Sequence, residues 1–201
     1  TKAAFHLHIL PHQLYPAFGP AQDKHAWYRD TKYLGSEERT AAFVGAMEEL
    51  GREEGIEFRF GGLVGDTLQA HRVVQYFQEV DADGDVGKGE AQQGQTRASR
   101  IVDALYRMYF EEEKDLSSHE TLVAACIEAG IEEGEARRVV VEDEGEGLME
   151  LKALLRESAL NGIDSVPHIM FEGRRRDLTL VGAKKVGEYV KAMETIAKES
   201  T

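Results

Sequence analysis

The chain has 201 residues, 42% of them hydrophobic, which is enough to bury the core of one domain or of one domain that carries an insertion. Its 37 acidic residues outnumber its 24 basic ones, and the resulting formal charge of −13 argues against nucleic acid and anionic membrane surfaces as partners. With one cysteine, no secretory signal and no apolar run of the roughly 18–20 residues that cross a membrane, we expect a cytoplasmic protein without internal disulfides.

The first predicted elements are a strand and a helix. Hydrophobic alternation predicts a strand over residues 4–10, which Pro11 ends because proline cannot donate a ladder hydrogen bond. Ser36, followed by two glutamates, predicts a helix start. Apolar residues at helical spacing carry this helix to Gly51 or Gly55.

The middle of the chain is predicted to be mainly helical. A short strand over residues 56–60 precedes a helix that Asp66 or Thr67 caps. Residues 81–95 are rich in glycine, aspartate and glutamine, which predicts a flexible loop. From this loop to Leu160 the apolar spacing predicts four further helices.

The period changes again near the C-terminus. Residues 166–171 and 178–181 predict a β-hairpin, and residues 186–196 predict a last amphipathic helix. Strands on both sides of a helical block indicate the α/β class, or α+β by the order of the elements. We predict three segments: the first part of a core with a connecting helix (1–65), a helical insertion domain (66–160) and the C-terminal part of the core (161–201).

Several segments resemble one known family. Residues 162–171 (GIDSVPHIMF), the hairpin and the last helix look like the C-terminal half of DsbA-type thioredoxin folds. Other segments resemble the FrnE branch of that group: 10–16 (LPHQLYP), 66–72 (DTLQAHR), 104–110 (ALYRMYF) and 118–122 (SHETL). Over nearly all of residues 4–198 the chain is thus similar to the DsbA/FrnE-like thioredoxin-fold family, whose relatives include 2-hydroxychromene-2-carboxylate isomerase and kappa-class glutathione transferase. The resemblance implies a thioredoxin-like sheet with a helical insertion, and thiol–disulfide oxidoreductase activity.

The chain departs from this family at its redox motif. The family's first strand and the Cys-x-x-Cys that follows it would precede residues 4–10, and the chain does not contain them. In the thioredoxin sheet that strand lies beside residues 4–10, which would lose a neighbour and leave backbone groups unpaired. Either the natural protein has residues before Thr1, or a shortened product fills this slot with another element. Cys126, alone in an apolar stretch, is expected to be a packed residue without redox chemistry.

The resemblance also implies a site at Val166 and Pro167. In that group the Val-Pro peptide bond is cis and faces the reactive cysteines. His168 comes next and is a candidate catalytic residue, for proton transfer or for hydrogen bonding to a ligand. The alternative for His168 is an ordinary half-buried strand histidine.

A second group of candidate binding residues lies at a predicted helix start. Asp66, Thr67, His71 and Arg72 either line a cleft between the insertion and the core or have structural roles, as a helix cap and in ordinary polar contacts. The family has asparagine where this chain has Asp66. The sequence leaves both readings open.

We expect neither a metal nor a visible cofactor. His6 and His8 share a strand face, but Pro11 breaks that geometry before His12. The resemblance suggests glutathione as a cofactor, but Lys184 argues against glutathione binding. Relatives that bind glutathione have small hydroxyl and acidic residues at that point.

Three functional hypotheses follow. The first is a DsbA/FrnE-like oxidoreductase that acts on thiol substrates and whose Cys-x-x-Cys segment is absent from this chain. The second is a cysteine-free relative that acts on a small molecule in the cleft, as an isomerase or a biosynthetic auxiliary enzyme. The third is a non-catalytic binding module, a homodimer in which each subunit covers the open sheet edge of the other. We favour the first.

Overall fold

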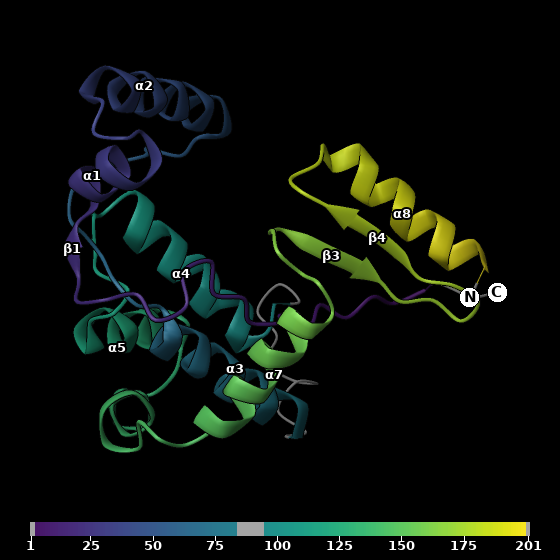
Figure 1. Cartoon of the computed structure of the whole chain (residues 1–201). Coiled ribbons are helices and arrows are strands. Elements are labelled where there is room, and N and C mark those ends of the chain that lie inside the picture. Colours follow the sequence, from purple (N-terminus) through teal and green to yellow (C-terminus); the bar gives the residue numbers. More distant parts are fainter. Residues whose placement is uncertain (1–2, 84–94, 200–201) are drawn as a thin grey trace. The chain divides into compact units, whose positions relative to one another are not determined.

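The chain folds as two compact units. The computed structural model describes residues 3–83 and 95–199, so most of the predicted loop 81–95 lies outside the described residues. One unit is Thr1–Leu14 with Ala153–Thr201, here called the hairpin unit, and the other is Tyr15–Lys152, the helical unit (Figure 1). The predicted domain boundaries after residues 65 and 160 stay a prediction.

The helical unit contains one short two-stranded sheet and a series of helices. In chain order these are β1 (Gln22–Asp23), α1 (Lys24–Trp27), the π-helix η1 (Tyr28–Lys32), α2 (Glu37–Glu54), β2 (Leu63–Val64), α3 (Leu68–Asp83), α4 (Arg97–Phe110), α5 (His119–Glu128), α6 (Glu133–Arg137), the π-helix η4 (Arg138–Glu142) and the start of α7 (Leu148–Leu160). Strands β1 and β2 pair antiparallel.

Helix ends follow the capping chemistry that the sequence predicts. The Ser36 hydroxyl accepts a hydrogen bond from the Arg39 N–H at 3.3 Å and starts α2. Gly55, with φ of +76°, ends α2 in the left-handed conformation that glycine adopts most readily. Thr96 caps α4 in the same way as Ser36, through the Ser99 N–H at 3.1 Å. Both predicted ends of α2 are therefore confirmed.

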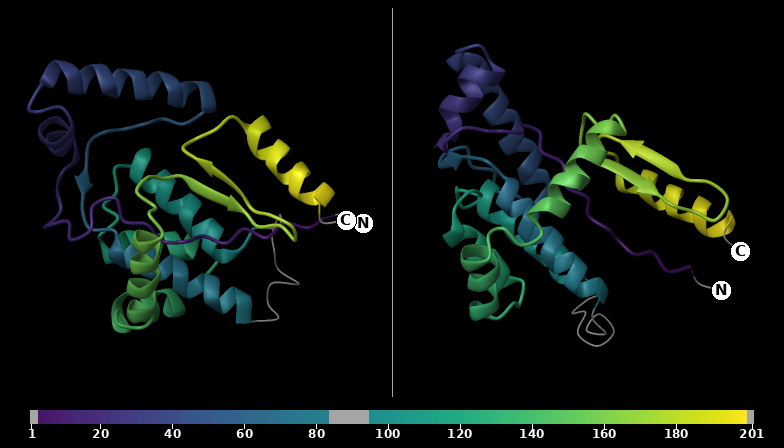
Figure 2. Two further views of the ribbon diagram at one scale, coloured as in Figure 1. Left: turned by 45° about the vertical axis from the view of Figure 1, so that its right-hand side comes forward. Right: turned by 60° about the horizontal axis from the view of Figure 1, so that its bottom comes forward.

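Three helices build the core of the helical unit. Helix α3 packs on α4, and α4 packs on α5 (Figure 2). Their apolar stripes meet in the interior, and the predicted stripes are confirmed by the buried side chains of Val73, Val74, Phe77, Ile101, Leu105, Met108 and Leu122. No helix among the described residues has both the length and the apolar character needed to cross a membrane.

The predicted strand at residues 56–60 is wrong. This segment runs beside the end of α4, which supplies its hydrogen-bond acceptors. The Arg59 N–H donates to the Phe110 carbonyl at 2.7 Å, and the Glu57 N–H donates to Glu111 Oε2 at 3.2 Å. Alternation of side chains thus indicated an extended segment correctly, but its neighbour is not a strand.

The predicted strand at residues 4–10 is wrong as well. Neither sheet among the described residues includes this segment. Phe5, Leu7 and Leu10 are exposed, while Pro11 is buried. A strand requires a hydrogen-bonded neighbour, and in the family's sheet that neighbour is the strand that this chain lacks.

Among the described glycines of the helical unit, Gly62 would bring an added Cβ closest to another part of the backbone. Its φ is +73°, and a Cβ at this position would lie 2.2 Å from the Glu113 carbonyl oxygen. Its own carbonyl accepts the Lys24 N–H at 3.0 Å. The residue therefore joins the start of α1 to the chain after α4, and only glycine fits.

We expect Gly62→Ala to lower the free energy of unfolding by about 2–4 kcal/mol, because it adds left-handed strain to a clash with backbone. Urea denaturation followed by circular dichroism measures this. Gly45→Ala is the matched control, since a Cβ at Gly45 would meet nothing within 4 Å. Equal midpoints for the two variants would show that the Gly62 approach relaxes freely.

The hairpin unit contains the predicted hairpin and last helix. Strands β3 (His168–Phe171) and β4 (Leu178–Val181) pair antiparallel, with His168 opposite Val181. Helix α8 (Val186–Glu199) packs on β3 and buries Ala192 and Ile196 (Figure 2). Hairpin, last helix and mixed α/β class are confirmed.

Candidate functional site

The predicted site of the hairpin unit lies where the chain enters β3. The Val166–Pro167 peptide bond is cis. The Pro167 carbonyl accepts the Gly182 N–H at 2.8 Å, which closes the open end of the hairpin. Val166 is 43% exposed, and within the described residues its N–H and C=O form no hydrogen bond. This leaves one exposed residue with both backbone groups available to a ligand.

His168 follows directly as the first residue of β3. It is half-buried, and none of the described residues forms a hydrogen bond or ion pair with its imidazole. Both expectations for His168 therefore agree with this placement, the half-buried strand histidine and the ligand contact.

The second group of candidates forms the start of α3 in the helical unit. Asp66 Oδ1 accepts the Leu68 N–H at 2.7 Å, and the Thr67 carbonyl accepts the His71 N–H at 3.0 Å. These contacts favour the structural reading, a cap that satisfies the first N–H groups of the helix. Val166 belongs to the hairpin unit, whereas these residues belong to the helical unit. A cleft that they share with Val166 therefore stays a prediction.

Arg72 has a structural role that its exposure and its partners make clear. It is 1% exposed, and its guanidinium donates to the carbonyls of Val139 (2.6 Å), Glu146 (3.2 Å) and Asp143 (3.4 Å), and to Gln69. Burial lowers the pKa of Arg72, opposed by the neighbouring acidic side chains of residues 143–146. Four of its five N–H donors are thus occupied by the chain itself.

The acidic side chains of the turn at residues 143–146 form further ion pairs with other parts of the helical unit. Arg138 forms ion pairs with Asp143 and Glu146 and donates to the Tyr76 hydroxyl at 2.6 Å, which raises its pKa. His119 Nε2 lies 2.8 Å from a Glu144 carboxylate oxygen. The sequence did not predict these contacts, because Arg72 and Tyr76 are separated by more than sixty residues from the residues that they contact in η4 and the turn after it.

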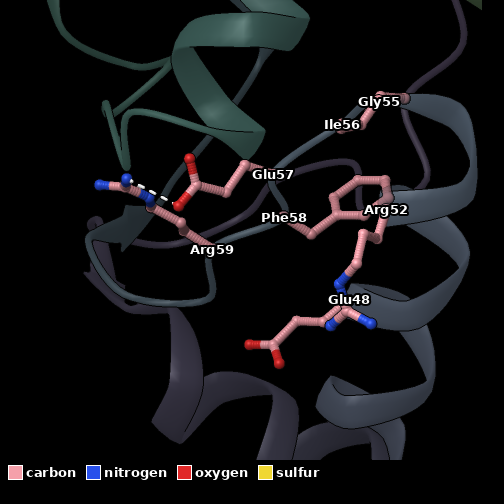
Figure 3. A pocket seen from close by; sticks show the side chains of 7 residues that line it. All are labelled: Glu48, Arg52, Gly55, Ile56, Glu57, Phe58 and Arg59. Atoms are coloured by element: carbon pink, nitrogen blue, oxygen red, sulfur yellow. Dashed lines mark hydrogen bonds and ion pairs between the residues drawn. The ribbon is translucent and has the colours of Figure 1, made fainter.

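One hollow of the helical unit also escaped prediction. It has a volume of about 470 Å³ and lies between the end of α2 and the segment after it (Figure 3). Arg59 and Glu57 pair on one side at 3.1 Å, and Glu48 and Arg52 project from the helix on the other. The hollow is open and carries charges of both signs. It contains none of the predicted site residues.

A smaller hollow belongs to the hairpin unit. It has a volume of about 270 Å³ and is lined by Ala3 and Phe5 together with Val190, Met193, Glu194 and Ala197 of α8. Among the described residues no group of three or more His, Cys, Asp or Glu is arranged to hold a metal ion. His12 instead lies 3.5 Å from the Ser158 hydroxyl.

The comparisons with known proteins agree with this geometry. The model of the DSBA-like thioredoxin domain matches residues 4–194. The chain belongs to the DSBA-like thioredoxin domain family. A solved structure of a probable DsbA oxidoreductase from Streptomyces coelicolor is similar, with a TM-score of 0.73 and 24% identity, over 94% of this chain and 74% of that chain. No curated protein matches.

This DSBA-like domain has one thiol, that of Cys126, and its buried position makes it unreactive. Cys126 is 0% exposed inside α5, as expected from its apolar stretch. Burial raises the pKa of Cys126 to about 12, with Glu135 adding to the rise and Arg72 opposing it. A dithiol for exchange chemistry would therefore have to come from outside residues 1–201.

Proposed function

We propose that this chain is the substrate-binding part of a DsbA/FrnE-like thiol–disulfide oxidoreductase, with the Cys-x-x-Cys supplied by residues outside 1–201. In that reaction a thiolate attacks a substrate disulfide, one substrate sulfur leaves as a thiolate, and the second cysteine resolves the mixed disulfide. Membership of the DSBA-like family supports this assignment.

The observation that carries the proposal is the unpaired backbone of Val166, an exposed residue. Its N–H and C=O are unpaired within the described residues, directly before the proline that opens the hairpin. An extended peptide can pair with such a residue as a short antiparallel strand. A thiol substrate held there would lie along the edge of β3, beside His168.

Two measurements on one preparation test the proposal. The protein from its native source is expected to have an intact mass above the 22.4 kDa of residues 1–201 and to catalyse insulin reduction by dithiothreitol. Residues 1–201 alone are expected to show no catalysis. A native mass equal to that of residues 1–201 would sink the proposal.

We keep a second candidate function because of His168. Its half-buried imidazole without a partner among the described residues suits a cysteine-free enzyme that transfers a proton on a small molecule. A ligand screen by thermal shift should then find a compound whose stabilising effect His168→Ala abolishes. His12→Ala is the control, and a screen without such a compound argues against this candidate.

A homodimeric binding module is the third proposal. Met170 and Val190 are exposed on β3 and α8, which leaves apolar area for a second subunit to cover. Light scattering that finds a stable monomer contradicts it. Glutathione is not part of any of these proposals, because relatives that bind it have small hydroxyl and acidic residues near the position of Lys184.

A further inference from the structure

The hollow between the end of α2 and the segment after it is built around two glycines. We call it the α2 hollow; its lining consists of Glu48, Arg52, Gly55, Ile56, Glu57, Phe58 and Arg59 (Figure 3). After Gly55 ends α2, the Ile56 N–H donates to the Gly51 carbonyl at 2.8 Å and closes the turn. Gly51 also lets the Phe58 ring lie against the helix, because a Cβ at Gly51 would be 2.4 Å from that ring. Phe58 therefore supplies an apolar wall of the hollow.

The segment opposite the helix is held in place by α4. The N–H groups of Glu57 and Arg59 donate to residues 110 and 111 at the end of α4. The Phe58 ring meets the Phe110 ring edge to face, with the centroids 5.4 Å apart. The side chains of Glu57 and Arg59 pair with each other at 3.1 Å. This wall is therefore arranged before a ligand arrives, which lowers the cost of binding.

The helix presents two charged side chains without partners to the same hollow. Glu48 and Arg52 stand at i and i+4 on α2, the spacing at which a glutamate and an arginine commonly pair. Among the described residues, however, neither side chain forms a hydrogen bond or an ion pair, with the other or with any third group. A ligand that binds both therefore breaks no existing ion pair.

We infer that the α2 hollow binds a zwitterionic α-amino acid with an apolar side chain, a function separate from the thiol chemistry proposed above. Its volume of about 470 Å³ is typical of small-molecule sites, which range over roughly 300–1,000 Å³. The Arg52 guanidinium donates to the carboxylate of the ligand, and the Glu48 carboxylate accepts from its ammonium group. The apolar side chain of the ligand packs on Phe58.

The charges of the lining select this class of ligand. Two glutamates and two arginines line the hollow, so their formal charges sum to zero, and a ligand with a net charge gains little from the site as a whole. An α-amino acid carries one charge of each sign on a single carbon. The two unpaired groups of α2 start from Cβ atoms that are about 5–6 Å apart, and such closely spaced charges can reach both. A longer peptide has its terminal charges at opposite ends and does not match this spacing.

A titration of residues 1–201 with L-phenylalanine, followed in two-dimensional proton–nitrogen NMR spectra, tests the inference. We expect a saturable shift of the backbone signals of residues 56–59 with a millimolar Kd. Two analogues remove one charge each: 3-phenylpropionate lacks the ammonium group, and 2-phenylethylamine lacks the carboxylate. Both should bind at least about tenfold more weakly, because each loses one charge-assisted hydrogen bond. No shift of these signals with phenylalanine, or equal affinity for all three compounds, would overturn the inference.

Three variants assign the two charges of the ligand to their partners. All three replace exposed side chains, and unchanged circular dichroism checks that the fold is intact. Arg52→Ala should weaken phenylalanine binding at least about tenfold. Glu48→Gln should reduce the preference for phenylalanine over 3-phenylpropionate to less than about threefold, which a loss of structure would not do selectively. Arg39→Ala, an arginine near the start of α2 and outside the hollow, is the matched control and should bind like the parent chain. Full affinity in Arg52→Ala, an unchanged preference in Glu48→Gln, or an equal loss in Arg39→Ala would each contradict the site.

Discussion

Arg72→Ala is expected to lower the free energy of unfolding by about 3–5 kcal/mol, the combined cost of unpaired carbonyls and of the space left by a large buried side chain. The substitution leaves the buried carbonyl of Val139 without its donor, and it also removes the donor of the Asp143 and Glu146 carbonyls, which belong to exposed residues. It also empties the volume of a side chain that is 1% exposed. Urea denaturation followed by circular dichroism measures the loss.

Two further variants make this result specific. Arg72→Lys is expected to recover only a small part of the loss, because a single ammonium cannot reach three carbonyls that a planar guanidinium spans. Arg52→Ala, an exposed arginine of the same unit that lines the hollow beside α2, should change the unfolding free energy by less than about 0.5 kcal/mol. A loss for Arg72→Ala no larger than that for Arg52→Ala would mean that Arg72 is not structural, and the ligand-contact reading would stand.

Arg72 illustrates which features of this fold local sequence can predict. The cap at Ser36 and the apolar stripes of α3 and α4 are set by residues within one or two turns, so their sequence patterns were sufficient. The three carbonyl partners of Arg72 lie 67 or more residues away, in η4 and the turn after it, whose own sequence gives no sign of a buried arginine. The side chain could therefore be named as a candidate, but its role could not be determined.

The strands also could be predicted only where the residues that pair with them are close in the sequence. Residues 168–171 and 178–181 form their hairpin because each supplies the other's hydrogen bonds a few residues away. Residues 4–10 and 56–60 have equally good alternation, but their pairing depends on distant chain, and neither becomes a strand. Period-two alternation predicts an extended segment, while a strand also needs a partner.

Candidate residues could be predicted where a sequence motif marks them. Features that depend on the three-dimensional arrangement could not be predicted. The Val-Pro-His motif alone marks residues 166–168 as candidates. The π-helix η1 (Tyr28–Lys32), in contrast, is indicated by no periodic pattern in the sequence. The hollow beside α2 depends in the same way on how a segment without regular structure lies against a helix.

Cys126 is expected to be inert toward thiol reagents in the folded protein and to destabilise the fold at high pH. At pH 8, modification by Ellman's reagent should be at least 100-fold slower than in 6 M guanidinium chloride, because the thiol is 0% exposed and must wait for local unfolding. Fast modification under native conditions would contradict the burial of α5 and reopen a redox role for this residue.

The alkaline effect follows from the raised pKa of Cys126, about 12 in the folded chain against 9.0 for an ordinary thiol. Between these values the unfolded chain releases a proton that the folded chain retains, so the stabilising contribution is complete below pH 9 and is lost as the pH rises. The free energy of unfolding should fall by up to about 1.4 kcal/mol per pH unit from this group alone. Comparison with Cys126→Ala isolates the contribution of the thiol to this pH dependence, because lysines and tyrosines titrate alike in both proteins. If the two proteins lose stability in parallel between pH 9 and 11, the thiol is not the group responsible, and its pKa is close to that of an exposed cysteine.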